Sequence, residues 1–216
     1  MLSLLLCEIL FGGCGRRNPL LFRLSKDYLP LTVGNSWEYI YSDGYTFSVV
    51  IDTTETKESR LAFRLMKNYQ TEYWWKGEGD FAEYVSYSVY FGGDEYSVEK
   101  RWRKHLVLPL VMGNKWEDPY QGTTLIAGTT LDRESNLEGE VVGIEKINLP
   151  SGNFEECYKV HLVYSSKMIS PLFSTAETLL VDEWYAPDVG LIKRWEKDKT
   201  SGEVKQYFLT KYSVKK

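Results

Sequence analysis

The sequence predicts a mainly β protein: a single curved antiparallel sheet or half-open β-barrel, built as a meander of about twelve strands. Three observations predict this class. Aromatic residues make up 15% of the 216 residues, and aromatic side chains favour strands. Apolar and polar residues alternate along much of the chain, as in half-buried strands. Short segments rich in Gly, Pro, Asp, Asn and Ser separate the alternating stretches, so tight turns are expected between consecutive strands.

Each strand is predicted from this alternation. Residues 81–91 show it well, because Phe81 and Val85 fall on one face and Tyr84 on the other. Helical periodicity is weak, so at most one or two short helices are expected, with residues 20–28 as the candidate. The expected strands are 37–41, 45–53, 60–68, 72–76, 81–91, 96–104, 123–131, 138–147, 154–164, 178–185, 191–197 and 204–213.

An internal echo links two segments of the chain. Residues 29–38 and 108–117 agree at seven of ten positions. Each copy has a Pro that favours an extended entry, a Gly-Asn pair suited to a turn, and a Trp that begins or flanks a strand. The same strand entry is therefore expected twice. An ancient duplication and two symmetry-related edges of one sheet are both compatible with the echo.

The first 14 residues are largely apolar and end in Gly12-Gly13-Cys14. The segment is too short to span a bilayer, and it is typical of a signal-peptide core. Its ending resembles the lipobox of bacterial lipoproteins, which implies acylation of Cys14 and a lasting lipid anchor. Residues 15–27 are then expected to be a tether, and residues 28–216 a single antiparallel β domain. The alternative is an apolar N-terminus that is not processed.

Charge and cysteine content narrow the range of partners and stabilising features. The net charge of −4 provides no basic field, so nucleic acid is not an expected partner. Cys7 and Cys14 both lie in the first segment, which leaves Cys157 alone in the β domain. No disulfide is expected there, and Cys157 is interpreted as a small buried apolar residue.

Three longer motifs resemble a family of uncharacterised bacterial envelope lipoproteins. They are the Pro-Leu-x-x-Gly-Asn-x-Trp motif within residues 28–37, the segment 149–160, and the Trp-Tyr-Ala-Pro-x-Val-Gly motif within residues 183–193. The resemblance implies a lipid-anchored protein of the bacterial cell envelope, on the periplasmic or surface side. More distantly, the chain is similar in architecture to the half-open β-barrels of periplasmic lipoprotein carriers, in which a curved sheet cradles acyl chains.

Common catalytic and metal-binding motifs are absent from the sequence. His105 and His161 are isolated, so neither is expected to bind metal, and no catalytic residue or cofactor is predicted. The adjacent acids Asp182 and Glu183 would point to opposite faces of a strand and could not act together. Convergence of three acids in one cleft, or of His105 with an acid and a hydroxyl, would favour a hydrolase instead.

Two short segments supply the candidate contacts for a ligand or partner. The basic run 100–105 would place Arg101 and Arg103 on one face of a strand and Trp102 on the other. Basic residues beside an aromatic ring can contact lipid headgroups or a polyanionic polymer, although charge also protects an ordinary edge strand. Trp74 and Trp75 cannot both face inward, so one is expected in the core and the other on a surface.

The sequence therefore favours a non-catalytic envelope lipoprotein that acts as a binding or assembly module. Its expected partners are the membrane, through the N-terminal lipid, and a lipid, envelope polymer or envelope protein. The alternative is a periplasmic lipid or lipoprotein carrier, which would need a continuous apolar cavity in a half-barrel. A hydrolase with an unrecognised site ranks third.

Overall fold

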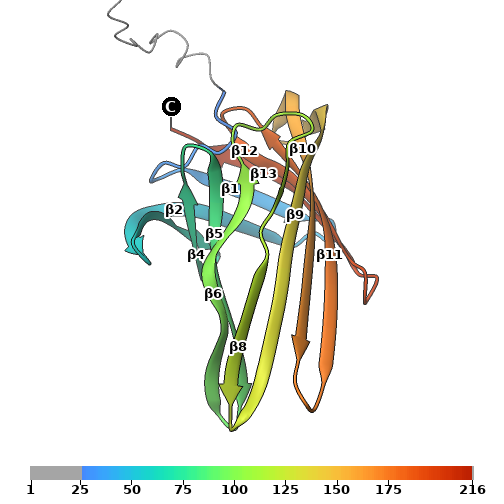
Figure 1. Cartoon of the computed structure of the whole chain (residues 1–216). Coiled ribbons are helices and arrows are strands. Elements are labelled where there is room, and N and C mark those ends of the chain that lie inside the picture. The colour runs from blue at the N-terminus through green and yellow to red at the C-terminus, as the bar shows by residue number, and fades with distance from the viewer. Residues whose placement is uncertain (1–25, 216) are drawn as a thin grey trace, which may run out of the picture.

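The computed structural model describes residues 26–215 (Figure 1). These residues form one antiparallel sheet of 13 strands, which curls into a nearly closed, barrel-like shape. No residue from 26 to 215 is helical. The predicted fold class is therefore confirmed. The signal segment, Cys14 and most of the expected tether lie outside the described residues.

The strands follow one another along the chain with short connections. The first six are β1 (Ser36–Tyr41), β2 (Thr46–Lys57), β3 (Arg60–Lys67), β4 (Gln70–Lys76), β5 (Asp80–Phe91) and β6 (Asp94–Val107). The other seven are β7 (Lys115–Glu117), β8 (Tyr120–Ile126), β9 (Thr129–Leu149), β10 (Gly152–Ile169), β11 (Ser174–Ala186), β12 (Gly190–Asp198) and β13 (Val204–Ser213).

The order of strands in space brings the middle of the chain to the two edges of the sheet. The order runs from β6 down to β1, then from β13 down to β9, which pairs with both β7 and β8. The first and last strands of the domain are therefore neighbours, through the ladder between β1 and β13. The two edges are β6 on one side and β7 with β8 on the other, and they approach each other across a seam.

Side chains, not a backbone ladder, close this seam. Three side chains of β7 and β8 donate hydrogen bonds of 3.0–3.1 Å to backbone carbonyls of β6. These bonds join Trp116 to His105, Tyr120 to Val98 and Thr124 to Ser97. Because an unpaired strand edge carries free peptide groups, the donors satisfy acceptors that a neighbouring strand would otherwise bind.

The two echo segments adopt the same local structure. In each copy the glycine has a positive φ, 93° at Gly34 and 81° at Gly113, which glycine adopts without a Cβ clash. In each copy the glycine N–H donates to a strand carbonyl, and that strand residue donates back to the carbonyl of the following Asn. The first copy joins Gly34 and Asn35 to Ile51, and the second joins Gly113 and Asn114 to Val141.

The copies also have related places in the sheet. The first leads into β1, which pairs with β13, and the second leads into β7, which faces β6 across the seam. If the chain has an internal two-fold relation, its halves meet at two junctions. The junction of β1 with β13 is a full backbone ladder, whereas the junction of β7 with β6 is the seam.

The apolar core consists of two clusters that share partly buried neighbours. The first includes Trp37 and Ile51, and the second includes Leu106 and Leu162. The segment 27–31 crosses one end of the barrel-like sheet, with Leu29 only 4% exposed. Lys76 of β4 donates from Nζ to the Asp27 carboxylate at 2.7 Å and to the Leu29 carbonyl at 2.8 Å, which fixes this segment over the core.

Two details of the predicted secondary structure were wrong. The alternation over 123–131 predicted one strand, but the chain turns at Ala127 and Gly128, between β8 and β9. Alanine gives no turn signal, so the pattern continued through the turn. The short strand β7 was missed as a separate element. Of residues 20–28, the candidate for a short helix, 26–28 are not helical, and the others lie outside the described residues.

Candidate ligand-binding site

A cavity of about 500 Å³ lies inside the barrel-like sheet. Its volume is within the range of roughly 300–1,000 Å³ that is typical of pockets for one small molecule. The segment 29–31 lines one part of the cavity, and the exposed Glu177 lines another, so the cavity reaches the surface. Its apolar lining includes Trp37, Phe47, Val49, Trp74, Leu179 and Leu191.

The polar part of the cavity centres on His105, which is 2% exposed. Its Nε2 lies 2.8 Å from Oε2 of Glu183, and its Nδ1 lies 3.4 Å from Oε2 of Glu83. The Tyr164 hydroxyl is 3.0 Å from Nδ1, and the Tyr185 hydroxyl donates to Glu183 at 2.6 Å. Strands β5, β6, β10 and β11 therefore bring two acids, a histidine and two phenols together.

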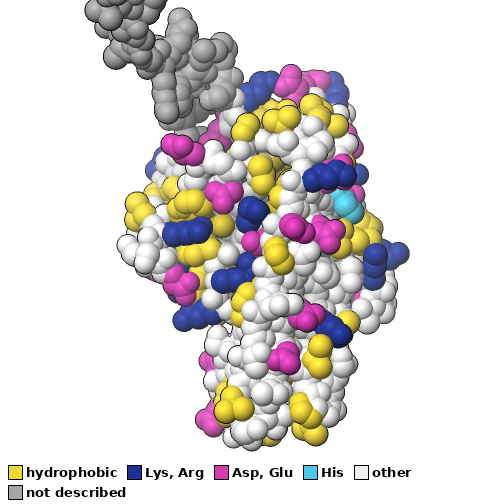
Figure 2. All heavy atoms as spheres, viewed as in Figure 1, with side chains coloured by type: hydrophobic (Ala, Val, Ile, Leu, Met, Phe, Trp, Pro, Cys, Tyr) yellow, Lys and Arg dark blue, Asp and Glu magenta, His cyan; other side chains and the backbone are white. Residues whose placement is uncertain are grey.

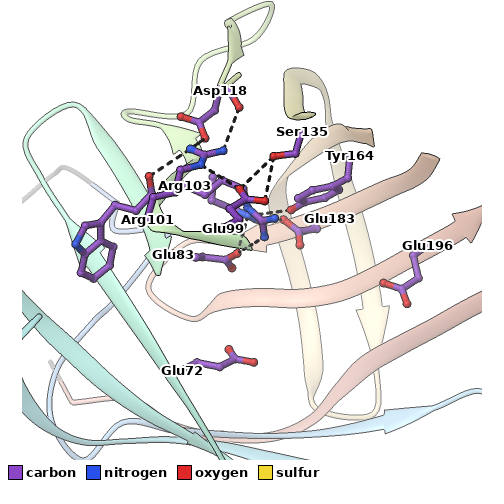
Figure 3. A network of polar contacts seen from close by, with 12 residues as sticks. Glu72, Glu83, Glu99, Arg101, Arg103, Asp118, Ser135, Tyr164, Glu183 and Glu196 are labelled. Atoms are coloured by element: carbon purple, nitrogen blue, oxygen red, sulfur yellow. Dashed lines mark hydrogen bonds and ion pairs between the residues drawn. The ribbon is translucent and has the colours of Figure 1, made fainter. Parts of the chain in front are cut away.

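An arginine extends this cluster at each end. Nη2 of Arg103 donates to Glu83 at 3.2 Å, and Nη1 of Arg194 donates to Glu183 at 2.8 Å. Nε of Arg194 donates in turn to Glu196 at 3.1 Å. Figure 3 shows Arg103, Glu83, Tyr164 and Glu183 converging from different strands. The result is a continuous row of alternating charges through the interior.

Strand register explains why these side chains meet. Glu83 of β5 is paired with Arg103 of β6, and Glu183 of β11 is paired with Arg194 of β12. Paired residues of antiparallel strands point to the same face. Asp182, next to Glu183, points to the opposite face, where its Oδ1 lies 2.7 Å from Nδ1 of His161.

Ion pairs and burial shift the pKa values of the titratable groups in this cluster away from 7. Burial alone would lower the pKa of His105, but the carboxylates of Glu83 and Glu183 outweigh it and raise that pKa to about 9. Burial opposes ionisation of Glu183, yet the charges of His105 and Arg194 lower its pKa to about 2. The pKa of Glu83 is likewise well below its usual value, and burial raises the pKa of Tyr164.

The interior meets the geometric condition that the sequence set for a hydrolase, because His105, an acid and a hydroxyl share one cavity. The pKa values of His105, Glu83 and Glu183 do not suit general acid–base catalysis at neutral pH. A general base needs a pKa near the working pH, and His105 is held as a cation at neutral pH. The carboxylates of Glu83 and Glu183 are held ionised and paired, so neither is a proton donor at pH 7.

A second polar cluster lies at the seam and centres on Glu99 of β6, which is 3% exposed. Glu99 accepts hydrogen bonds from Nε of Arg133 at 2.7 Å and from the Ser135 hydroxyl at 3.1 Å, both on β9. Arg101 binds Glu99 at 3.0 Å and also pairs with Asp118. Figure 3 shows Glu99 with Arg101, Asp118 and Ser135. The contacts of Glu99 join the two edges of the sheet near the cavity, which Arg133 and Ser135 also line.

The predicted tryptophans lie on different faces. Trp74 lines the cavity and packs edge-on against Phe81, with ring centroids 5.3 Å apart. Trp75 does not line the cavity and instead stacks with Arg60, whose guanidinium carbon lies 4.3 Å from the ring centroid. The guanidinium of Arg60 also lies 5.5 Å from the Trp102 ring, so Trp75 and Trp102 share a patch away from the interior.

The predicted arginines both point inward but have different surroundings. Arg101 belongs to the seam cluster with Glu99 and Asp118. Arg103 lines the cavity, and its guanidinium carbon lies 4.8 Å from the centroid of the Tyr164 ring. The structure thus brings Trp74 and Arg103 to one cavity, with Arg101 nearby at the seam.

Sequence reasoning missed five residues of the interior cluster: Glu83, Glu183, Arg194, Tyr164 and Tyr185. Alternation could have placed each on the inner face of its own strand. It could not have shown that β5, β6 and β10–β12 face one another, because that depends on contacts between distant segments.

The remaining predicted features have ordinary surroundings. Cys157 is buried, its thiol lies 3.6 Å from the Phe154 carbonyl, and burial raises its pKa to about 11, so it is an unreactive thiol.

Among residues 26–215, no group of three or more His, Cys, Asp or Glu side chains could hold a metal ion. The same residues include no helix that is long and apolar enough to cross a membrane.

The outer surface in Figure 2 carries interspersed acidic and basic side chains, with no large patch of one charge on the face shown. Apolar side chains lie at its lower end, where the β5–β6, β8–β9 and β10–β11 turns are found. The large exposed apolar residues of these turns and their flanks are Tyr90, Phe91, Leu125, Leu172 and Phe173.

Comparisons with known proteins give limited similarity. A DUF3108-like family model matches residues 129–208, from β9 into β13. A candidate lipoprotein from Parabacteroides distasonis is 16% identical, with 87% of this chain and 99% of that chain covered and a TM-score of 0.49. A candidate exported protein with a YmcC-like fold from Bacteroides fragilis is 13% identical, with 88% and 100% covered and a TM-score of 0.48. A search of curated proteins gave no match.

Proposed function

We propose that this protein is a non-catalytic binding module of the bacterial cell envelope, and that it takes one small molecule into the interior of its β domain. The observation that carries this proposal is the cavity of about 500 Å³, lined on one part by aromatic and aliphatic side chains and on another by fixed charges. Pockets for small ligands combine an apolar lining with a few well-placed polar groups in this way.

The pairing of the interior charges supports a binding role over catalysis. Catalytic acids and bases are tuned toward the working pH, whereas His105, Glu83 and Glu183 are tuned away from it. A paired and rigid charged row can orient a ligand without transferring a proton. The proposal therefore assigns these residues to positioning and stability.

The row of interior charges distinguishes the proposed small-molecule binding module from a lipid or lipoprotein carrier. Such a carrier needs a continuous apolar cavity for its acyl chains, but charged residues from β5, β6, β11 and β12 line the interior. Placing hydrocarbon against ionised groups would strip them of solvent without replacing its hydrogen bonds. A ligand with both a polar and an apolar part fits the lining better.

The envelope location rests on the N-terminal Gly12-Gly13-Cys14 ending. Replacement of Cys14 by Ser tests it, with labelled palmitate followed in growing cells. Loss of the label together with release from the membrane fraction is the expected result. Label retained in the Cys14→Ser variant would refute Cys14 as the site of lipid attachment.

Native mass spectrometry of the full chain, purified from an envelope fraction, tests ligand binding. We expect a population that carries one small molecule. Val49→Phe should reduce that population because Val49 lines the cavity, whereas its neighbour Val50 does not, so Val50→Phe is the matched control. Recovery of only ligand-free protein from wild type, or equal occupancy in both variants, would contradict the proposal.

A further inference from the structure

Arg103 has more hydrogen-bonding capacity than its neighbours in the described chain use. Among residues 26–215, its side chain makes one hydrogen bond, from Nη2 to Glu83, and its Nε is buried with no partner. Arg101, two residues earlier, instead donates to Glu99, Asp118 and the Trp102 carbonyl. Among the described arginines, Arg103 alone has a buried side-chain donor without a partner.

Part of the Arg103 side chain is open to the cavity. Arg103 is a lining residue, and 26% of its side chain is accessible, so a molecule in the cavity can reach it, whereas Nε itself is buried. The Tyr164 ring, 4.8 Å from the guanidinium carbon, holds the guanidinium from one side, and Glu83 holds Nη2. The group is therefore oriented before any ligand arrives, which reduces the entropy lost on binding.

Guanidinium chemistry limits what would bind there. A guanidinium presents parallel N–H donors that match the paired oxygens of a carboxylate or phosphate.

The other cations that line the cavity have counter-charges, so an anion would have to be held by Arg103. Arg133 pairs with Glu99, Arg194 with Glu183 and Glu196, and Lys67 with Glu72. Arg103 pairs with Glu83 alone, and Glu83 also contacts His105.

We infer that the interior site binds an amphiphile with a carboxylate or phosphate head, and that Arg103 holds the head while the apolar lining holds a short tail. The inference rests on the proposed function and adds the chemical class of the ligand. Trp74, Phe47 and Val49 supply apolar lining in the same cavity, so head and tail would both be accommodated.

Isothermal titration calorimetry of the full chain with three probes tests the inference. The probes are decanoate, decyl phosphate and decanol, which share a tail and differ in the head. We expect one or both anions to bind about tenfold to a hundredfold more tightly than decanol, the effect of a hydrogen bond to a charged group. The stronger anion identifies the head as carboxylate or phosphate.

Variants separate the role of Arg103 from folding. Arg103→Gln should remove the preference for the anion without weakening decanol binding. Arg103→Lys keeps a positive charge beside Glu83 and should retain only part of the preference. Arg60→Gln is the control, because Arg60 stacks on Trp75 and does not line the cavity, and it should change nothing. Melting curves of each variant exclude unfolding as the cause.

The calorimetry tests the anionic head of the ligand separately from the proposed function, which is interior binding of a small molecule. Equal binding of all three probes, or an anion preference that survives in Arg103→Gln, would overturn the inference while leaving interior binding intact. No binding of any probe would also overturn it. The proposed function is judged separately, by the mass of the protein recovered from the envelope.

Discussion

The imidazole Nε2 of His105 and the carboxylate of Glu183 lie 2.8 Å apart in the interior, although 78 residues separate them in the sequence. Both side chains are at most 2% exposed, so this is a buried ion pair. Its neighbours Glu83 and Arg194 extend it to both sides of the cavity. The stability of the domain and the shape of the site therefore depend on the same groups.

Replacement of His105 should be strongly destabilising. His105→Gln would leave Glu83 and Glu183 without their shared cation, and breaking a buried pair by removing one partner typically costs about 3–5 kcal/mol. Urea denaturation at pH 7 measures this loss. The control is His161→Gln, because His161 is 39% exposed beside Asp182, and exposed pairs contribute about 1 kcal/mol or less. Similar losses in the two variants would contradict the interior ion pair.

Stability should fall at both ends of the pH scale. The pKa of His105 is raised from 6.5 to about 9, so its contribution is complete below pH 6.5 and is lost as the pH rises through 9. The pKa of Glu183 is lowered from 4.5 to about 2, so its contribution is complete above pH 4.5 and is lost as the pH falls through 2. The melting temperature should therefore be highest between pH 4.5 and 6.5. His105→Gln should flatten the alkaline loss, and an unchanged profile in that variant would count against the assignment.

Two glycines of β9 should respond differently to the same substitution. A Cβ on Gly139 would lie 2.2 Å from the ring of Trp116, which is buried at the seam, whereas a Cβ on Gly143 would meet Lys159 at 3.7 Å. Gly139→Ala should therefore destabilise by about 1–3 kcal/mol through overpacking. Gly143→Ala should be neutral or stabilise by up to about 1 kcal/mol, because Ala restricts the unfolded chain. Chemical denaturation of both variants checks the difference, and equal effects would show that Trp116 can move away.

The turn between β8 and β9 offers a stabilising substitution. Ala127 has a φ of 48° and Gly128 a φ of 83°, the two positive angles of a tight hairpin turn. Asn tolerates this conformation better than Ala, so Ala127→Asn should stabilise by about 0.5–1 kcal/mol. Ala127→Val should destabilise, because a β-branched residue is strained there. A melting temperature that moves in the same direction for both would exclude backbone strain as the cause.

The same turn shows how far the sequence could predict the fold. Alternation and turn residues predict the β class and most strands, because both depend on neighbours in the sequence. At Ala127 the turn is imposed by pairing between β8 and β9, which the local residues do not reveal. The interior site has the same origin. The pattern around Arg103 predicts that it shares a face with His105, but Glu183 reaches His105 only because β6 and β11 lie across the interior from each other.

The seam should open more readily than the rest of the sheet. Glu99 holds β6 against β9 through Arg133 and Ser135. Burial opposes ionisation of Glu99, but the charges of Arg133 and Arg101 and the hydrogen bond from Ser135 outweigh it and lower its pKa. Glu99→Gln should weaken these contacts, because hydrogen bonds to charged groups contribute about 1.5–3 kcal/mol and a neutral amide leaves Arg133 uncompensated.

Hydrogen exchange would locate this effect. In Glu99→Gln, amides of β6 should exchange faster, while those of β1 and β13 change little, because a continuous backbone ladder joins β1 to β13. Glu134→Gln is the matched control, since Glu134 is an exposed residue of β9 next to Arg133. A uniform increase over the whole sheet would mean that the seam opens only when the domain unfolds. An increase confined to β6 would identify the seam as the part of the barrel wall that separates first, beside the residues that line the cavity.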